Sequence, residues 1–94
     1  MIDGEFIKYY DTGEILSKFN IIDYKKHGEY TYYYQSGEIM IKYYYLDGEK
    51  HGEYIYYFIS GEIMIKYYYI DGEFVSELDW FCYTRNIKFE LLGL

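Results

Sequence analysis

Residues 28–51 read GEYTYYYQSGEIMIKYYYLDGEKH, and residues 52–75 read GEYIYYFISGEIMIKYYYIDGEFV. These two blocks of 24 residues share 18 positions and align without an insertion. Residues 4–27 form a more diverged block that keeps glycine at the same two places, Gly4 and Gly13. A fixed period of this length is typical of repeat proteins, in which each unit buries its apolar surface against its neighbours.

The 94 residues fit one domain, 1–94, built from repeats 4–27, 28–51 and 52–75. Extending the period into residues 76–94 places Ser76 and Arg85 where the other blocks have glycine, and Phe81 under Tyr57. Because terminal repeats are usually atypical, the sequence predicts a degenerate capping repeat over 76–94.

The composition favours β-strands. The chain has 17 Tyr, 6 Phe and 1 Trp but no Ala or Pro, so strand propensity is high and every backbone amide can join a ladder. In the second block, Ser36-Gly37 predicts a tight two-residue hairpin turn, and residues 47–52 predict a looser connection. We expect an all-β fold: one single-layer antiparallel meander of roughly seven to eight strands. It should be elongated and twisted, with stacked hairpins and no substantial helix.

The alternation of side chains separates the two faces of this sheet. If Gln35 pairs with Glu38, then Tyr34 faces Ile39, while Tyr32 faces Ile41 and Tyr30 faces Tyr43. That aromatic and apolar face is expected to be packed, and the opposite face, which mixes rings with lysines, to be wetter. Exposed rings often dominate the binding energy of an interface. The candidate partner-binding residues on the wetter face are therefore Tyr33, Lys42, Tyr44, Tyr57, Lys66 and Tyr68.

Charge and cysteine content limit the partners and the compartment. A net charge of −7 disfavours binding to nucleic acid and to anionic lipid headgroups. Cys82 is the single cysteine, which argues against a disulfide framework and favours a reducing compartment. The sequence contains neither a secretory signal nor an apolar run of the ~20 residues that span a bilayer. We expect a cytoplasmic protein without membrane insertion.

Candidate catalytic and metal-binding residues have simpler explanations. His27 and His51 occupy equivalent turns two strands apart, ~9–10 Å in a flat sheet, which is too far for them to share a metal ion. The series Glu5, Glu29 and Glu53 offers equal environments, whereas acid–base catalysis needs carboxyl groups with different pKa values. Cys82 is expected to be a small packed residue of the cap. The sequence therefore predicts no catalytic, cofactor-binding or metal-binding residue, and so no enzyme.

The repeat resembles a known family. The glycine, aromatic and turn positions of residues 28–52, from Gly28-Glu29-Tyr30 to His51-Gly52, resemble the MORN-repeat variant found in many small bacterial proteins. The resemblance covers residues 4–75 strongly. It implies an elongated, curved single sheet that acts as a binding or scaffolding module. Some proteins of this family are catalogued as antitoxin components of toxin–antitoxin pairs.

Three functions follow from these observations. The first is a non-enzymatic module for protein–protein interaction or scaffolding, and the second is its sharper form, an antitoxin-like protein whose acidic surface neutralises a basic toxin. The third is an aromatic-repeat module that binds carbohydrate or the cell wall, because residues 56–64 faintly resemble choline-binding repeats. The outer strands also leave unpaired backbone edges, through which the chain can associate with itself.

Overall fold

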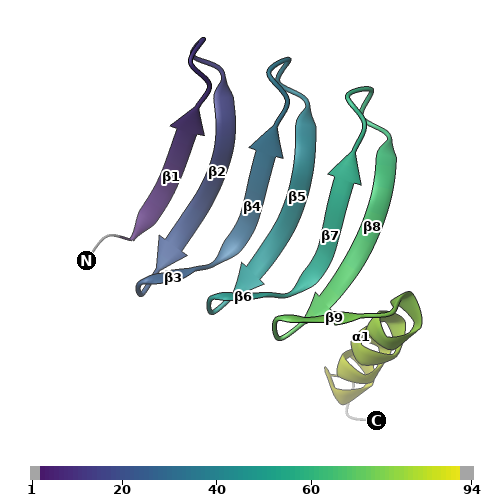
Figure 1. The fold of residues 1–94 in the computed structure, drawn as a ribbon. Helices are drawn as coiled ribbons and strands as arrows, with labels where there is room; N and C mark the ends of the chain where they lie inside the picture. The colour runs from purple at the N-terminus through teal and green to yellow at the C-terminus, as the bar shows by residue number, and fades with distance from the viewer. Residues whose placement is uncertain (1–2, 92–94) are drawn as a thin grey trace.

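The computed structural model describes residues 3–91, and the side chains of residues 3–85. It forms one open antiparallel sheet followed by a helix (Figure 1). The body of the sheet consists of six strands of six or eight residues: β1 (Gly4–Tyr9), β2 (Ile15–Ile22), β4 (Gly28–Tyr33), β5 (Ile39–Leu46), β7 (Gly52–Tyr57) and β8 (Ile63–Ile70). Each hairpin ends in a short strand: β3 (Lys25–Lys26), β6 (Glu49–Lys50) and β9 (Glu73–Val75). The helix α1 spans Glu77–Leu91.

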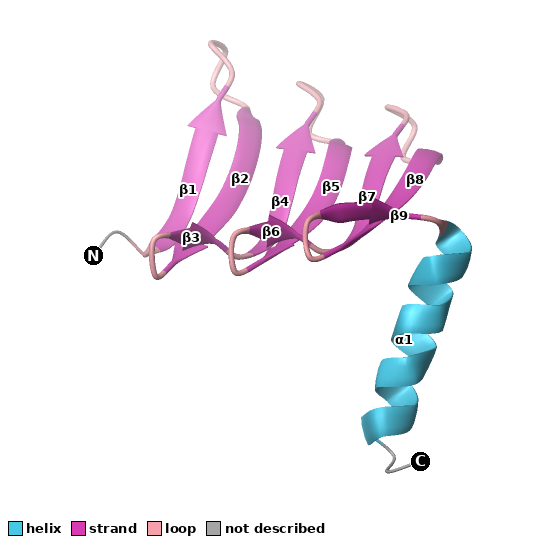
Figure 2. Cartoon of the chain, turned by 60° about the horizontal axis from the view of Figure 1, so that its bottom comes forward, coloured by secondary structure: helices cyan, strands magenta, loops and turns pink. Residues whose placement is uncertain are grey.

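The strand order confirms the predicted meander. It runs β1-β2-β4-β5-β7-β8-β9, with β3 paired to β2 and β6 paired to β5. The molecule is elongated, with extents of 53 × 38 × 22 Å. With the three short strands, the sheet described within residues 3–91 has nine strands, more than the seven to eight that we predicted. The short strands line up along one margin of the sheet, where Figure 2 shows them in front of the long strands.

The two kinds of turn are the reverse of our prediction. Asp47-Gly48 is the tight two-residue turn: both residues have positive φ, 50° and 87°, and Leu46 pairs with Glu49 across it. Asp71-Gly72 repeats this geometry with φ of 48° and 85°. Asp-Gly is a strong sequence signal for a turn in which both central residues need positive φ. The looser connection predicted for residues 47–52 is therefore wrong.

The other loop is longer than predicted. Gly37 donates its N–H to the carbonyl of Tyr34 at 2.9 Å, and Tyr34 donates to the carbonyl of Glu38 at 2.8 Å. This leaves a three-residue loop, 35–37, with Gly37 at φ +98°. A two-residue Ser-Gly turn would need positive φ at Ser36, whereas the three-residue loop needs it only at the glycine.

The structure contains two of the four residue pairs that we predicted between β4 and β5. Tyr30 faces Tyr43 and Tyr32 faces Ile41, but Tyr33 takes the place opposite Ile39 that we assigned to Tyr34. A β-bulge between these pairs inserts one extra residue, Met40, into β5. The same shift recurs at Tyr56/Tyr57 in the third repeat and at Lys8/Tyr9 in the first.

Residues 77–91 do not form a fourth hairpin. They form α1, which begins where the Ser76 hydroxyl accepts the N–H of Asp79 at 3.1 Å and the Ser76 carbonyl accepts that of Trp80 at 3.0 Å. Glu77 and Asp79 place negative charge in the first turn, which favours a helix start. The helix α1 therefore stands where we expected a degenerate capping repeat over 76–94, beside the predicted antiparallel sheet, and Cys82 is exposed rather than packed.

The core is a row of stacked rings that crosses the sheet, which we call the ring row. Successive centroids lie 5.5, 4.8, 5.1 and 4.4 Å apart from Phe6 through Phe19, Tyr30 and Tyr43 to Tyr54. Two lysines of the short strands cover these rings: Lys26 Nζ lies 5.4 Å from the Tyr30 centroid, and Lys50 Nζ lies 5.1 Å from that of Tyr54. Cation–π attraction and ring stacking stabilise the packing between units.

The opposite face is not the wetter one that we predicted. Tyr30 and Tyr43 are buried on the ring-row face, but Thr31, Ile55 and Tyr68 are buried on the other. At the last hairpin, Phe58, Ile63 and Ile65 of the expected packed face are exposed. Each long strand shields the next, so burial depends on having a neighbouring strand as much as on the face.

Candidate functional site

Three lysines cross the sheet in one line on the face opposite the ring row, which we call the lysine face. The register places Lys18 between Ile7 and Thr31, and Lys42 between Thr31 and Ile55, with Lys66 beyond Ile55. Along this line each lysine alternates with an apolar or small side chain, so that two lysines are always two strands apart. The repeat thus generates a periodic surface, with one lysine in each hairpin.

Lys42 lies at the centre of this line and is half-buried. Burial lowers its pKa, but nearby Tyr44, Tyr57 and Glu29 outweigh that effect, so that the pKa is raised overall. The Glu29 carboxylate also accepts a hydrogen bond of 2.8 Å from the hydroxyl of Thr31. Lys42 is therefore a firmly charged cation held between two rings and a carboxylate.

The flanking lysines have different partners. Lys66 Nζ lies 3.9 Å from Glu53 Oε1, and both side chains are partly exposed. Lys18 Nζ lies 5.8 Å from the ring centroid of Tyr33. A hollow of about 160 Å³ opens beside Lys18. Its lining residues are Glu5, Lys18, Phe19, Asn20, Glu29, Thr31 and Tyr33.

The structure brings together five of the six predicted residues on one accessible face. Tyr33 and Tyr44 lie in the same repeat as Lys42, while Tyr57 and Lys66 lie in the next one, and all five are half-buried. Half-burial holds each side chain in place by packing and leaves part of it available for contact.

Tyr68 differs from these residues because α1 covers it. Its side chain is only 7% exposed, and it stacks on Trp80 with centroids 5.5 Å apart and planes at 20°. We expected Tyr68 on the accessible surface, so this expectation is corrected. Trp80 also extends back over the sheet: a Cβ on Gly52 would lie 3.8 Å from its ring.

His51 helps to hold α1 on the sheet. Its ring meets Trp80 and Tyr83 edge-on, with centroids 6.1 and 5.6 Å apart. Nδ1 lies 3.3 Å from the backbone N of Asp71, and Nε2 lies 3.5 Å from the hydroxyl of Tyr83. His51 Nδ1 also lies 3.7 Å from Asp71 Oδ1, and His27, the equivalent in the first repeat, makes the same contact with Asp47 at 4.0 Å.

Sequence reasoning missed two kinds of contributor to the face. Lys18 and Glu29 keep the phase of Lys42 and Glu53, so the repeat alone could have assigned them to it. Trp80 carries no such signal, because it lies outside the repeats and reaches the face only through α1. The pattern of Ser76 followed by Asp79 three residues later could have revealed that helix.

The lysine face offers charge and aromatic contact. Its lysines are matched by carboxylates or rings, an arrangement that suits recognition of a complementary surface. Within residues 3–85, no three His, Cys, Asp or Glu side chains gather closely enough to hold a metal ion. Among the described residues, no helix has the length and apolar character needed to cross a membrane.

Comparison with known proteins gives one match. The family model described as MORN repeat variant matches residues 2–23 and 26–48. No curated protein and no solved structure matches the chain. The matched segments correspond to the first two hairpins, β1–β2 and β4–β5, with the turns that close them.

Proposed function

Because this chain belongs to the MORN repeat variant family, we propose that it is a non-enzymatic module that binds another protein through the lysine face. The observation that carries the proposal is the cluster of Lys42, Tyr44 and Tyr57: Lys42 pairs with Ile55, so that the half-buried rings of Tyr44 and Tyr57 flank it on the same face. Rings held in this way contribute large contact area at a small cost in conformational entropy, and they are common hot spots in interfaces.

The position of α1 supports this choice of face. Among the residues whose side chains are described, α1 lies against the lysine face at Tyr68 and Gly52, while Lys42, Tyr44 and Tyr57 stay half-buried. The opposite face is occupied along the ring row by Lys26 and Lys50. The lysine face is therefore the broad surface on which a partner meets rings and charges together.

The first experiment is affinity capture from the native host with the wild-type chain and with Tyr57→Ala and Lys42→Gln. We expect a stoichiometric partner that both variants lose. Tyr24→Ala is the matched control, because it removes an exposed tyrosine from the turn between β2 and β3. Thermal melting of every variant separates lost binding from lost folding. If the wild type captures no stoichiometric partner, or the face variants bind as well as Tyr24→Ala does, the proposal fails.

The finer form of the proposal is an antitoxin-like role in the cytoplasm. It is supported by the charge of −7, which would attract a basic toxin and accelerate their encounter. A toxin-like protein encoded beside this gene should inhibit growth when it is expressed alone, and co-expression of this chain should restore growth. The recovery should be greater the more tightly the two proteins bind, and Tyr57→Ala should abolish it. If growth is not restored although the two proteins bind, this role is excluded and the binding module stands.

The alternative is an aromatic-repeat module that binds carbohydrate or the cell wall. It is favoured by the exposed rings at the last hairpin and on β9, Phe58 and Phe74. Retention on choline resin or on isolated cell wall, competed by free choline or sugar, would support this alternative and contradict the protein-binding proposal. We expect the chain to pass through both without retention.

A further inference from the structure

The outer edge of β8 lacks the strand that covers the same edge in the two preceding repeats. On β2 that edge pairs with β4 through Ser17 and Lys18, and on β5 it pairs with β7 through Ile41 and Lys42. Within the described residues 3–91, β9 pairs with β8 only at residues 68–70. The backbone of residues 63–67 is therefore open on this side.

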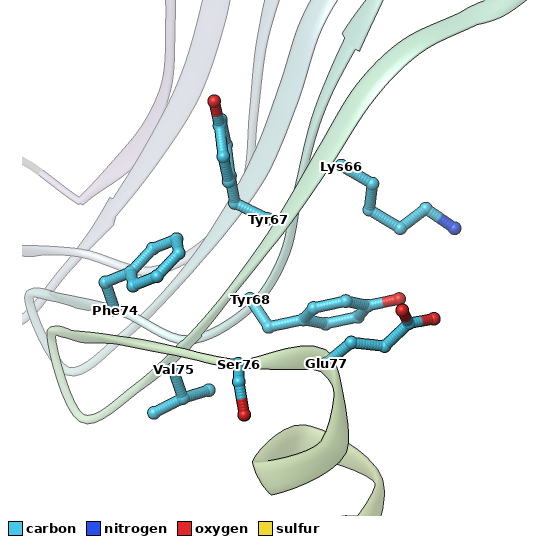
Figure 3. Close-up of a pocket in the computed structure, with 7 residues that line it drawn as sticks. All are labelled: Lys66, Tyr67, Tyr68, Phe74, Val75, Ser76 and Glu77. Atoms are coloured by element: carbon cyan, nitrogen blue, oxygen red, sulfur yellow. The ribbon is translucent and has the colours of Figure 1, made fainter.

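The side chains along this edge are more exposed than their equivalents in the second repeat, because no neighbouring strand of the described chain covers them. Ile63 and Ile65 are 50% and 41% exposed, whereas their equivalents Ile39 and Ile41 are half-buried beside β7. Met64 is exposed as well. Beside them lies a hollow of about 230 Å³, shown in Figure 3. Its lining residues are Lys66, Tyr67, Tyr68, Phe74, Val75, Ser76 and Glu77.

The terminal residues of the stack are more apolar than their internal equivalents. Position by position, Phe74 replaces Lys26 and Lys50, Phe58 replaces Tyr10 and Tyr34, and Ile59 replaces Asp11 and Gln35. At the opposite end of the sheet, Phe6 replaces Tyr30 and Tyr54. A repeat stack that remains single needs polar outer faces for solubility. Here the substitutions make both ends of the sheet more apolar than the internal repeats.

We propose that the outer edge of β8 binds β1 of a second copy of this chain, so that copies stack head to tail. This strand is the first-repeat equivalent of β4 and β7, which already fill the same place inside the chain. By the same register, Lys66 lies opposite Ile7 of the second copy, as Lys42 lies opposite Ile55. Phe6 of the second copy then meets Tyr67 and Phe74 and extends the ring row across the junction.

The helix leaves this place open. Trp80 stacks on Tyr68 and reaches Gly52, and Figure 2 shows α1 leaving the end of β9 and projecting away from the long strands rather than along the outer edge of β8. The contact is heterologous, because the head of one copy meets the tail of the next, and such contacts generate open stacks or closed rings. The proposal is independent of the partner that the lysine face binds.

Sedimentation equilibrium over a wide concentration range tests the stacking. The wild type should show an average mass that rises with concentration above the 11.6 kDa of one chain. The rise should be greater at high salt, because each copy carries a charge of −7 that salt screens. Ile65→Lys should abolish the rise. Leu46→Lys, which changes a residue of similar exposure, 46%, away from the edge, should not. A wild type that stays at one chain's mass overturns the proposal.

A mixing experiment identifies the occupant of the edge. Ile65→Lys blocks the tail and Phe6→Lys blocks the head, so each variant alone should stay monomeric and the mixture should form a one-to-one dimer. If Phe6→Lys alone still associates, β8 pairs with another β8 and the proposal is wrong.

If Phe6→Lys does not fold, disulfide trapping can show instead whether β8 of one copy pairs with β1 of the next. In a Cys82→Ser background, Ile7→Cys and Lys66→Cys chains should cross-link mainly to each other. Cross-linking mainly between two Lys66→Cys chains would overturn the proposal.

Discussion

Each position of the repeat is filled three times, so that a deviation in one copy can be compared with the other two. Position 17 is serine in the first repeat and isoleucine at positions 41 and 65. Ser17 is only 1% exposed, and its hydroxyl has no hydrogen-bond partner within the described part of the chain. A buried polar group without a partner costs stability.

We predict that Ser17→Ala raises the free energy of unfolding by about 1 kcal/mol, because it removes this unsatisfied hydroxyl. Chemical denaturation measures the change. Thr31→Ala is the control: Thr31 is equally buried, but its hydroxyl donates to Glu29, so its removal should lower stability. Equal destabilisation by both changes would mean that the Ser17 hydroxyl is satisfied.

A second deviation lies in the tight turns. The second central residue is Gly48 or Gly72 in two repeats but Tyr24 in the first, where φ is 65°. Positive φ is costly for a side chain other than glycine. Tyr24→Gly should therefore raise the free energy of unfolding by ~0.5–1 kcal/mol, since Tyr24 is 71% exposed and loses little packing. The reverse change, Gly48→Tyr, should lower it. A stabilising Gly48→Tyr would contradict this account of the turn.

At the scale of elements, the ring row joins one hairpin to the next. Burial raises the pKa of Tyr30, Tyr43 and Tyr54 above the ordinary value of 10.0, because the ionised phenol loses its solvation among the other rings. The folded state therefore holds these protons more tightly than the unfolded chain does. Their contribution to stability is complete below pH 10 and is lost as the pH rises through the folded pKa.

We predict that stability falls above pH 10 and that three of the 17 tyrosines ionise only as the protein unfolds. Tyrosinate absorbance and circular dichroism, followed over one alkaline titration, measure both events. Tyr43→Phe should reduce the late-ionising class by one and shift unfolding to higher pH. If every tyrosine ionises before the sheet unfolds, the ring row does not exclude solvent as described.

Trp80 makes more of the described ring contacts between α1 and the sheet than any other residue of the helix. Trp80 stacks on Tyr68 and Tyr83 and meets His51 edge-on. Trp80→Ala should therefore reduce the helical signal in circular dichroism and make Tyr68 accessible to iodination, while the sheet still unfolds cooperatively. Leu78→Ala, at an exposed position of the same helix, should change neither readout. An unchanged helical signal in Trp80→Ala would show that α1 does not need the sheet.

At the scale of the whole molecule, the sequence predicts what the repeat controls. The pairs Tyr30–Tyr43 and Tyr32–Ile41 and the meander itself follow from alternation along strands joined by turns. The bulge at Met40 could not be predicted this way, because it depends on the length of the neighbouring loop. The burial of Tyr68 was also out of reach, since it depends on a helix outside the repeats. The placement of Tyr33, Lys42, Tyr44, Tyr57 and Lys66 on one face therefore follows from the repeat, whereas the position of Tyr68 is set by α1.

The central claim is that the lysine face meets a partner, and lysine acetylation footprinting of the captured complex tests it most directly. The account predicts that Lys42 and Lys66 react more slowly in the complex than in the free chain. Lys26, which is exposed and lies over the ring row on the other face, should react equally in both. Equal reactivity of Lys42 and Lys66 with and without the partner, or protection confined to Lys26, would contradict the account.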